Sequence, residues 1–169
     1  MADPILPKGF RVTPIAGALG AEIEGVDLSR DLDTTTFEAV HRALLDHQVI
    51  FFRDQNLTPE AHKKFARRFG SLTIHPYVKG MDGHPEVVEI IKEPQDKMNF
   101  GGGWHSDTSF MEEPALGSIL HALEIPPYGG DTLFASQYLA YETLSKGLRD
   151  LLDTMSALHT AKAEYGRQG

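Results

Sequence analysis

The sequence contains no cysteine among its 169 residues. This excludes disulfide bonds, thiolate metal sites and a cysteine nucleophile. Long apolar runs are also missing: no stretch approaches the ~18 residues of a membrane-spanning helix, and the start lacks the apolar core of a signal peptide. Basic residues are few, with 16 Lys and Arg against 24 Asp and Glu, which gives a net charge of -8. This acidic balance argues against nucleic acid and anionic membranes as partners, and we expect a cytoplasmic protein.

What the chain does contain is enough apolar material for a core. Hydrophobic residues make up 41% of the sequence, which is normal for a globular protein. At this length we expect a single domain spanning residues 1–169. One basic cluster, formed by Lys63, Lys64, Arg67 and Arg68, has helical spacing and is typical of a solvated helix face.

Two longer helices are predicted from apolar periodicity and end signals. The first would start at a capping box formed by Thr35 and Glu38 and run to about residue 47. The second would have Thr58 as its N-cap, with a proline directly after it, and would end before Gly70.

Shorter elements surround these helices. Ser136 and Ser145 are expected to cap two short helical segments. The continuously apolar residues 49–52 predict a strand that is covered on both faces. Further strands are predicted at residues 10–15, 21–26, 71–74, 86–92, 116–125, 131–135 and 155–159. Strands scattered among helices indicate an α+β fold.

The strongest chemical signal lies in residues 101–110, Gly-Gly-Gly-Trp-His-Ser-Asp-Thr-Ser-Phe. His105 and Asp107 are two residues apart, so on an extended segment their side chains project to the same side. With a second histidine from elsewhere they would form the 2-His-1-carboxylate face that holds non-haem Fe(II) and leaves coordination positions open. The glycines allow close backbone approach, while Trp104 and Phe110 would bracket the pair with apolar bulk.

Other interpretations of these residue types stay open. The spacing alone does not distinguish a metal site from a surface histidine beside a capping aspartate. The same spacing recurs in His84-Pro85-Glu86, where the proline and the preceding Gly83 favour a turn. His121 could bind a metal in principle, although a histidine satisfied within a sheet is the expected role.

Residues 104–110, followed by Gly129-Gly130-Asp131-Thr132-Leu133, resemble the taurine/2-oxoglutarate dioxygenase family, the TauD/TfdA group. Further matches are Gly-Ala-Glu-Ile at 20–23, His-Gln-Val-Ile-Phe-Phe-Arg-Asp-Gln at 47–55, Arg-Phe-Gly at 68–70 and Ile-His-Pro at 74–76. The resemblance runs in order through nearly all of the chain. It implies a double-stranded β-helix (jelly-roll) core with flanking helices, of which this chain supplies the first half. The family's second iron histidine and its 2-oxoglutarate-binding arginine have no counterpart in the sequence.

The resemblance also implies a function. It points to an Fe(II)- and 2-oxoglutarate-dependent dioxygenase that hydroxylates a small organic anion with O₂ and converts 2-oxoglutarate to succinate. The anion would be a sulfonate, a sulfate ester or a carboxylate. His105 and Asp107 would bind the iron, and Thr132 would hydrogen-bond the distal carboxylate of 2-oxoglutarate.

Substrate contacts follow from the same resemblance. His75 matches a family histidine that contacts the anionic group of the substrate, and Phe110 matches an aromatic wall of the pocket. Tyr77 lies one position away from the family's substrate tyrosine. Asn99 lies two residues before Gly101, where taurine-specific members have a polar contact. These departures leave the reaction type in place while making taurine itself an uncertain substrate.

Each residue also has a purely structural interpretation. Thr132 suits a strand, His75 suits a turn before a proline, and Phe110 suits a core. Two other function classes therefore stay open: a Zn or Mn hydrolase or lyase that uses His105 and Asp107, and a non-catalytic remnant or interaction module. Half of a jelly roll would leave strand edges and apolar surface uncovered, so we expect a homo-oligomer.

Overall fold

The computed structural model describes residues 6–97 and 100–162. Their contacts divide the chain into two compact units. The first unit comprises Met1–Phe69 and His121–Met155, and the second comprises Gly70–Leu120 and Ser156–Gly169. The expectation of one domain over residues 1–169 stays a prediction.

The first unit is built on a mixed three-stranded sheet in the order β1-β2-β3, with β1 at Arg11–Pro14, β2 at Ala21–Glu24 and β3 at Ile50–Phe52. β1 and β2 are antiparallel, whereas β2 and β3 are parallel, with Ala21 opposite Ile50. Parallel strands need a crossover connection, and α1 (Thr34–His47) provides it. These elements confirm the strands expected at 10–15, 21–26 and 49–52, and a mixed sheet with helices agrees with the α+β expectation.

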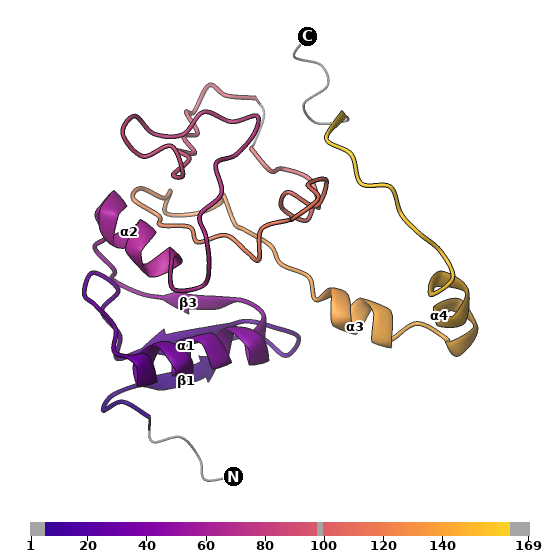
Figure 1. Ribbon diagram of the computed structural model, residues 1–169, viewed down its shortest axis with the longest axis horizontal. Coiled ribbons are helices and arrows are strands. Elements are labelled where there is room, and N and C mark those ends of the chain that lie inside the picture. The colour runs from indigo at the N-terminus through magenta and orange to yellow at the C-terminus, as the bar shows by residue number, and fades with distance from the viewer. Residues whose placement is uncertain (1–5, 98–99, 163–169) are drawn as a thin grey trace. The chain divides into compact units, whose positions relative to one another are not determined.

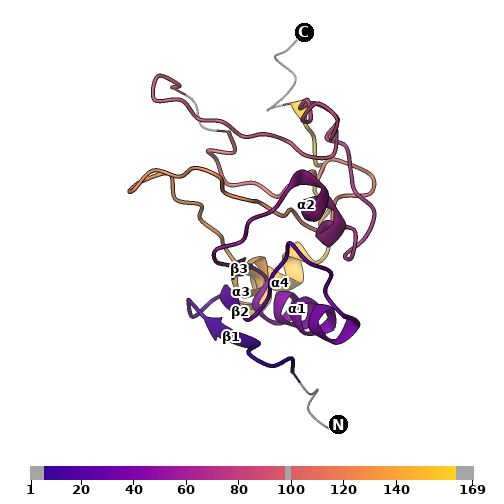
Figure 2. The ribbon, with the colours of Figure 1, turned by 90° about the vertical axis from the view of Figure 1, so that its left-hand side faces the viewer.

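The core of the first unit lies where α1 covers one face of this sheet (Figures 1 and 2). Val40 of α1 and Ala21 of β2 are both 0% exposed, and Ile23 of β2 is 3% exposed. Burying a valine or isoleucine side chain contributes about 1.5–3 kcal/mol. The edge strand β3 is half-buried at all three positions, so the cover expected on both of its faces is only partial.

The start of α1 differs from the expected capping box at Thr35 and Glu38. The N-cap is Asp33, whose Oδ1 accepts a hydrogen bond from Thr36 N at 2.7 Å, while its Oδ2 accepts one from Thr36 Oγ1 at 3.1 Å. These bonds hold the pKa of Asp33 below its ordinary value. A carboxylate is the stronger cap because its negative charge receives charge-assisted bonds at the positive end of the helix dipole.

α2 (Pro59–Ala66) begins as the sequence predicts, because Thr58 Oγ1 accepts a hydrogen bond from Ala61 N at 3.2 Å. Phe65 of this helix is buried, and its ring meets that of Phe52 in β3 edge-to-face, with 6.1 Å between the centroids. α2 is therefore fastened to the sheet through aromatic packing.

One member of the basic cluster, Arg68, lies just after α2 and is exposed, as expected for a solvated face, and it also makes specific contacts. Arg68 donates from Nη1 to the carbonyl oxygen of Leu32 at 2.8 Å, and its guanidinium carbon lies 4.2 Å from the ring centroid of Phe37. This cation–π contact and the hydrogen bond hold the segment before α1 against the end of α2.

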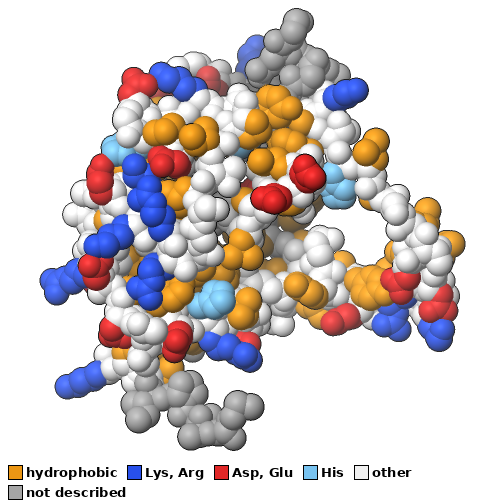
Figure 3. Space-filling view, viewed as in Figure 1, with side chains coloured by type: hydrophobic (Ala, Val, Ile, Leu, Met, Phe, Trp, Pro, Cys, Tyr) orange, Lys and Arg blue, Asp and Glu red, His pale blue; other side chains and the backbone are white. Residues whose placement is uncertain are grey.

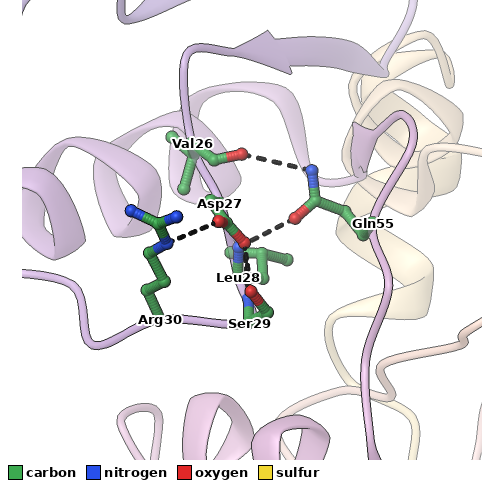
Figure 4. A network of polar contacts seen from close by, with 6 residues as sticks. All are labelled: Val26, Asp27, Leu28, Ser29, Arg30 and Gln55. Carbon is green, nitrogen blue, oxygen red and sulfur yellow. Dashed lines mark hydrogen bonds and ion pairs between the residues drawn. The ribbon is translucent and has the colours of Figure 1, made fainter.

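A second polar contact in the first unit centres on Gln55 (Figure 4). Gln55 Oε1 accepts a hydrogen bond from Leu28 N at 2.8 Å, and its Nε2 donates to the carbonyl oxygen of Val26 at 3.1 Å. Within the same loop Asp27 accepts hydrogen bonds from the side chain and backbone of Ser29, and these lower the pKa of Asp27. Gln55 thus joins the segment after β2 to the segment after β3.

The expected short helices are present. α3 (Gln137–Glu142) is capped by Ser136, which accepts from Leu139 N, and α4 (Lys146–Leu152) is capped by Ser145, which accepts from Leu148 N. Neither helix contains a buried residue, and Figure 3 shows hydrophobic side chains open on their surface. None of the described helices is long and apolar enough to cross a membrane.

Five predicted strands are wrong: those at 71–74, 86–92, 116–125, 131–135 and 155–159. Among the described residues of the second unit, the only strand-type pairing is an isolated bridge between Met81 and His84. An alternating pattern selects the two faces of a strand, but a strand forms only where a neighbouring strand completes its hydrogen-bond ladder. Without such a neighbour the apolar side chains of these segments stay exposed, as in Leu123 at 85%.

Candidate functional site

His105 and Asp107 lie in an irregular loop of the second unit with their side chains turned toward each other. Nε2 of His105 is 3.1 Å from Oδ1 of Asp107, and the two side chains are 54% and 51% exposed. A nitrogen and an oxygen donor, each bound at about 2.1 Å to adjacent positions of an octahedral metal, lie about 3.0 Å apart. The observed separation therefore fits two neighbouring ligands of one divalent metal.

The orientation of the His105 ring is set by its other nitrogen. Nδ1 lies 2.8 Å from the carbonyl oxygen of Gly103. A carbonyl can only accept, so Nδ1 carries the hydrogen and donates it, and Nε2 is the nitrogen left to bind a metal. Metal-binding histidines are commonly held in this way.

Of the three glycines that precede His105, Gly101 is the one whose position requires a glycine. Its φ of +65° lies in the left-handed region, and a Cβ at this position would lie 3.2 Å from Cε1 of His105. A Cβ at Gly103 would meet no atom within 4 Å. Close approach to the histidine is thus a requirement at Gly101 and not at Gly103.

The second oxygen of Asp107 has its own partner, which sequence reasoning missed. Ser118 Oγ donates to Oδ2 of Asp107 at 2.6 Å. The loop between them is also closed by a hydrogen bond from Ala115 N to Oγ1 of Thr108 at 3.2 Å. Nothing marks Ser118 in the sequence, because it lies in the segment 116–125 whose pattern predicts a strand.

Three expected substrate residues come together in the second unit. Nδ1 of His75 accepts hydrogen bonds from Tyr77 N at 3.2 Å and from Val78 N at 3.1 Å. The ring centroids of His75 and Tyr77 are 6.4 Å apart, and those of Tyr77 and Phe110 are 5.8 Å apart. The turn interpretation of His75 is therefore correct, and because Nδ1 accepts, the ring carries a hydrogen on Nε2.

Other expected residues are placed differently. Thr132 belongs to the first unit and is exposed in an irregular segment, while Asn99 lies outside the described residues. Trp104 is 73% exposed, so it provides no apolar wall beside the histidine. An aromatic side chain is covered only where other elements pack on it, and the irregular loop around Trp104 provides none.

Two further histidines, His121 and His84, take part in hydrogen bonds within the fold. His121 Nε2 lies 3.1 Å from the carbonyl oxygen of Gln55, which confirms a satisfied histidine, though not one within a sheet. His84 lies in a turn, with its backbone N donating to the carbonyl oxygen of Met81 at 2.9 Å. Within residues 6–97 and 100–162, no group of three or more His, Cys, Asp or Glu side chains could hold a metal. His105 and Asp107 form a pair, not a group of three.

Comparison with known proteins adds independent information. The family model described as "Taurine catabolism dioxygenase TauD, TfdA family" matches residues 11–169. The chain is 39% identical to an alpha-ketoglutarate-dependent sulfate ester dioxygenase of Pseudomonas putida, over 91% of this chain and 50% of that protein. It is also 39% identical to an alkylsulfatase of Acinetobacter baylyi, over 93% of this chain and 49% of that protein.

Solved structures give the same picture. A taurine dioxygenase from Burkholderia xenovorans superimposes with a TM-score of 0.77 at 43% identity, over 86% of this chain and 51% of that one. The chain thus spans about half the length of the curated relatives and of the solved structure that it matches.

Proposed function

Because the chain belongs to the TauD, TfdA family of dioxygenases, we propose that it supplies two metal ligands and a substrate-binding wall of an Fe(II)- and 2-oxoglutarate-dependent dioxygenase. The observation that carries this proposal is the 3.1 Å separation between Nε2 of His105 and Oδ1 of Asp107. The complete fold would be a double-stranded β-helix (jelly roll). The substrate would be a small organic anion: a sulfate ester, a sulfonate or a carboxylate.

His105 and Asp107 would hold the iron through a neutral imidazole nitrogen and a carboxylate oxygen, donors that suit Fe(II). The negative charge of Asp107 would offset part of the charge of the metal. A histidine from outside the described residues would complete the set of three. When bound, the iron supplies the O₂-dependent oxidation in which 2-oxoglutarate becomes succinate and CO₂ and the substrate gains a hydroxyl group.

Anion recognition would fall to His75. Its Nδ1 accepts from two backbone N–H groups, so its Nε2–H is the donor that can meet a sulfate, sulfonate or carboxylate oxygen. The rings of Tyr77 and Phe110, which pack on each other beside it, would contact the carbon skeleton of the substrate. Asn99 would add a polar contact to the substrate.

Thr132 would serve the co-substrate by donating its hydroxyl hydrogen to the distal carboxylate of 2-oxoglutarate. Its exposed side chain lies directly after the Gly129-Gly130-Asp131 turn, where both glycines have positive φ.

The proposal is tested with the full protein that carries this sequence, supplied with Fe(II), 2-oxoglutarate and O₂. Succinate formation should be stimulated by alkyl sulfates, alkyl sulfonates or carboxylates and not by neutral alcohols of the same chain length. His105→Ala and Asp107→Ala should be inactive. Cleavage of a sulfate ester without 2-oxoglutarate or O₂ would instead establish a metal hydrolase, and failure to bind metal or anion would favour an interaction module.

A further inference from the structure

We infer that Ser118 is a positioning residue that makes Asp107 a metal ligand through one oxygen only. This inference rests on the proposed function, since it concerns the metal that the function requires. It goes beyond that function because neither the spacing of His105 and Asp107 nor the family resemblance points to Ser118.

The two oxygens of Asp107 have different partners. Oδ1 faces Nε2 of His105 at 3.1 Å, whereas Oδ2 accepts the hydroxyl hydrogen of Ser118 at 2.6 Å. A separation of about 2.5–2.7 Å is typical of an O–H group donating to an ionised carboxylate, which is among the stronger hydrogen bonds in proteins. The carboxylate is therefore held in one rotation, with Oδ1 turned toward the histidine.

This arrangement limits how Asp107 can bind a metal. A carboxylate that chelates with both oxygens occupies two adjacent coordination positions, while one that binds through a single oxygen occupies one. Because Ser118 engages Oδ2, Asp107 presents only Oδ1 beside His105. One more position then stays open for small molecules that must bind the metal directly.

The loop that brings Ser118 to Asp107 is closed by other bonds as well. Thr108 has a positive φ of 49°, and its Oγ1 and backbone oxygen accept hydrogen bonds from Ala115 N and Met111 N. Ser118 itself is exposed. Removal of its hydroxyl should therefore leave the loop folded, so that changes in metal binding report on the carboxylate.

The experiment uses Mn(II), which accepts the same nitrogen and oxygen donors as Fe(II). Electron paramagnetic resonance measures the concentration of free Mn(II), which gives the Kd even when binding is weak. Ser118→Ala should raise the Kd about tenfold, the low end of the 10–100-fold effect of removing a hydrogen-bond partner from a ligand. Ser118→Thr keeps the hydroxyl and should bind within about twofold of wild type. Ser106→Ala is the matched control, an exposed serine between the two ligands whose hydroxyl makes no bond to Asp107 in the described residues.

A second measurement separates positioning from folding. The visible spectrum of bound Co(II) is sensitive to coordination number, so Ser118→Ala should change it while Ser118→Thr should not. The melting temperature of the metal-free protein should be the same for all these variants.

The outcomes distinguish the inference from the proposed function. If Ser118→Ala keeps the wild-type Kd and Co(II) spectrum while His105→Ala abolishes binding, the role of Ser118 is refuted and the metal site stands. If Ser118→Thr weakens binding as much as Ser118→Ala, the hydroxyl is not the cause and the inference also fails. If His105→Ala and Asp107→Ala bind Mn(II) like wild type, the metal site itself is wrong, and both proposals fall together.

Discussion

The interactions that stabilise the first unit internally differ from those within the second unit. In the first unit, residues 10–69 form backbone ladders and bury side chains such as Val40, Ile23 and Phe65. The described part of the second unit has no such ladder, and side-chain hydrogen bonds within short loops organise it instead. Stability and chemistry are thus assigned to different stretches of the chain. Substitutions at buried positions within residues 10–69 should change the free energy of unfolding, and substitutions of His105 or Asp107 should change binding.

The largest expected effect comes from Asp107→Ala in the second unit. It removes a charged metal ligand, so Fe(II)-dependent formation of succinate should be lost. Because the Asp107 side chain is 51% exposed, the free energy of unfolding should change by no more than about 0.5 kcal/mol. Succinate assays and urea denaturation measure the two quantities. Wild-type turnover in this variant would refute the ligand assignment.

Thr132→Val tests whether a first-unit residue also takes part in binding. The substitution keeps the β-branched shape and removes a hydroxyl that would donate to a carboxylate. Such bonds contribute about 1.5–3 kcal/mol, so the Kd for 2-oxoglutarate should rise roughly ten- to a hundredfold. Thr13→Val, an exposed threonine on β1, is the control and should bind 2-oxoglutarate normally. Equal affinities for both variants would remove Thr132 from the site.

Val40→Ala is the converse of Asp107→Ala. The side chain belongs to α1 itself and is fully buried, and the change removes two methyl groups and leaves a cavity. The free energy of unfolding should fall by about 2 kcal/mol while the Mn(II) affinity of the folded protein stays constant. Urea denaturation and a metal titration below the transition provide the comparison. A large loss of Mn(II) affinity would show that the two units are not energetically separate.

Local signals in the sequence were sufficient wherever the interaction spans a few residues. Thr58, Ser136 and Ser145 each cap the helix that follows, as expected, because the accepting oxygen and the donor N–H are neighbours in the chain. The two-residue spacing also placed His105 beside Asp107. At α1 the spacing pattern predicted a capping box at Thr35, whereas the N-cap is Asp33, whose negative charge that pattern does not take into account.

Non-local features could not be predicted in this way. The alternation in 116–125 specifies which side chains share a face, but it does not specify whether another strand is present to pair with that segment. The contact of Ser118 with Asp107 depends on how the intervening loop closes, which includes a positive φ at Thr108. A single serine carries no periodic or spacing signal.

Asp33 provides a pH-dependent test within the first unit. Its hydrogen bonds from Thr36 lower its pKa in the folded state, so the stabilisation is complete above the unfolded carboxyl pKa of about 4 and is lost as the pH falls through the folded pKa. Asp33→Asn keeps an accepting oxygen but cannot titrate. The stability advantage of wild type should therefore be constant near neutral pH and shrink in acid. A constant difference from pH 7 to pH 3 in urea denaturation would argue against the ionised cap.

The smallest effect is expected for Leu123→Ala, in a segment whose pattern predicts a strand that does not form. In dilute solution the 85% exposed side chain should contribute little, and the free energy of unfolding should change by less than about 0.5 kcal/mol. The homo-oligomer expected from uncovered apolar surface makes a further prediction. At higher protein concentration, wild-type stability should rise by mass action, and the variant should gain less.

Sedimentation velocity and urea denaturation across a concentration series measure both effects, with Leu6→Ala as a matched control. Leu6 is another exposed leucine of the first unit, 49% exposed, and lies outside the 116–125 segment. Association that persists unchanged in Leu123→Ala would place the interface elsewhere. A loss of about 2 kcal/mol in dilute solution would show that the side chain is already covered within one chain, and that the contrast between a buried first-unit core and an open apolar segment is smaller than the structure indicates.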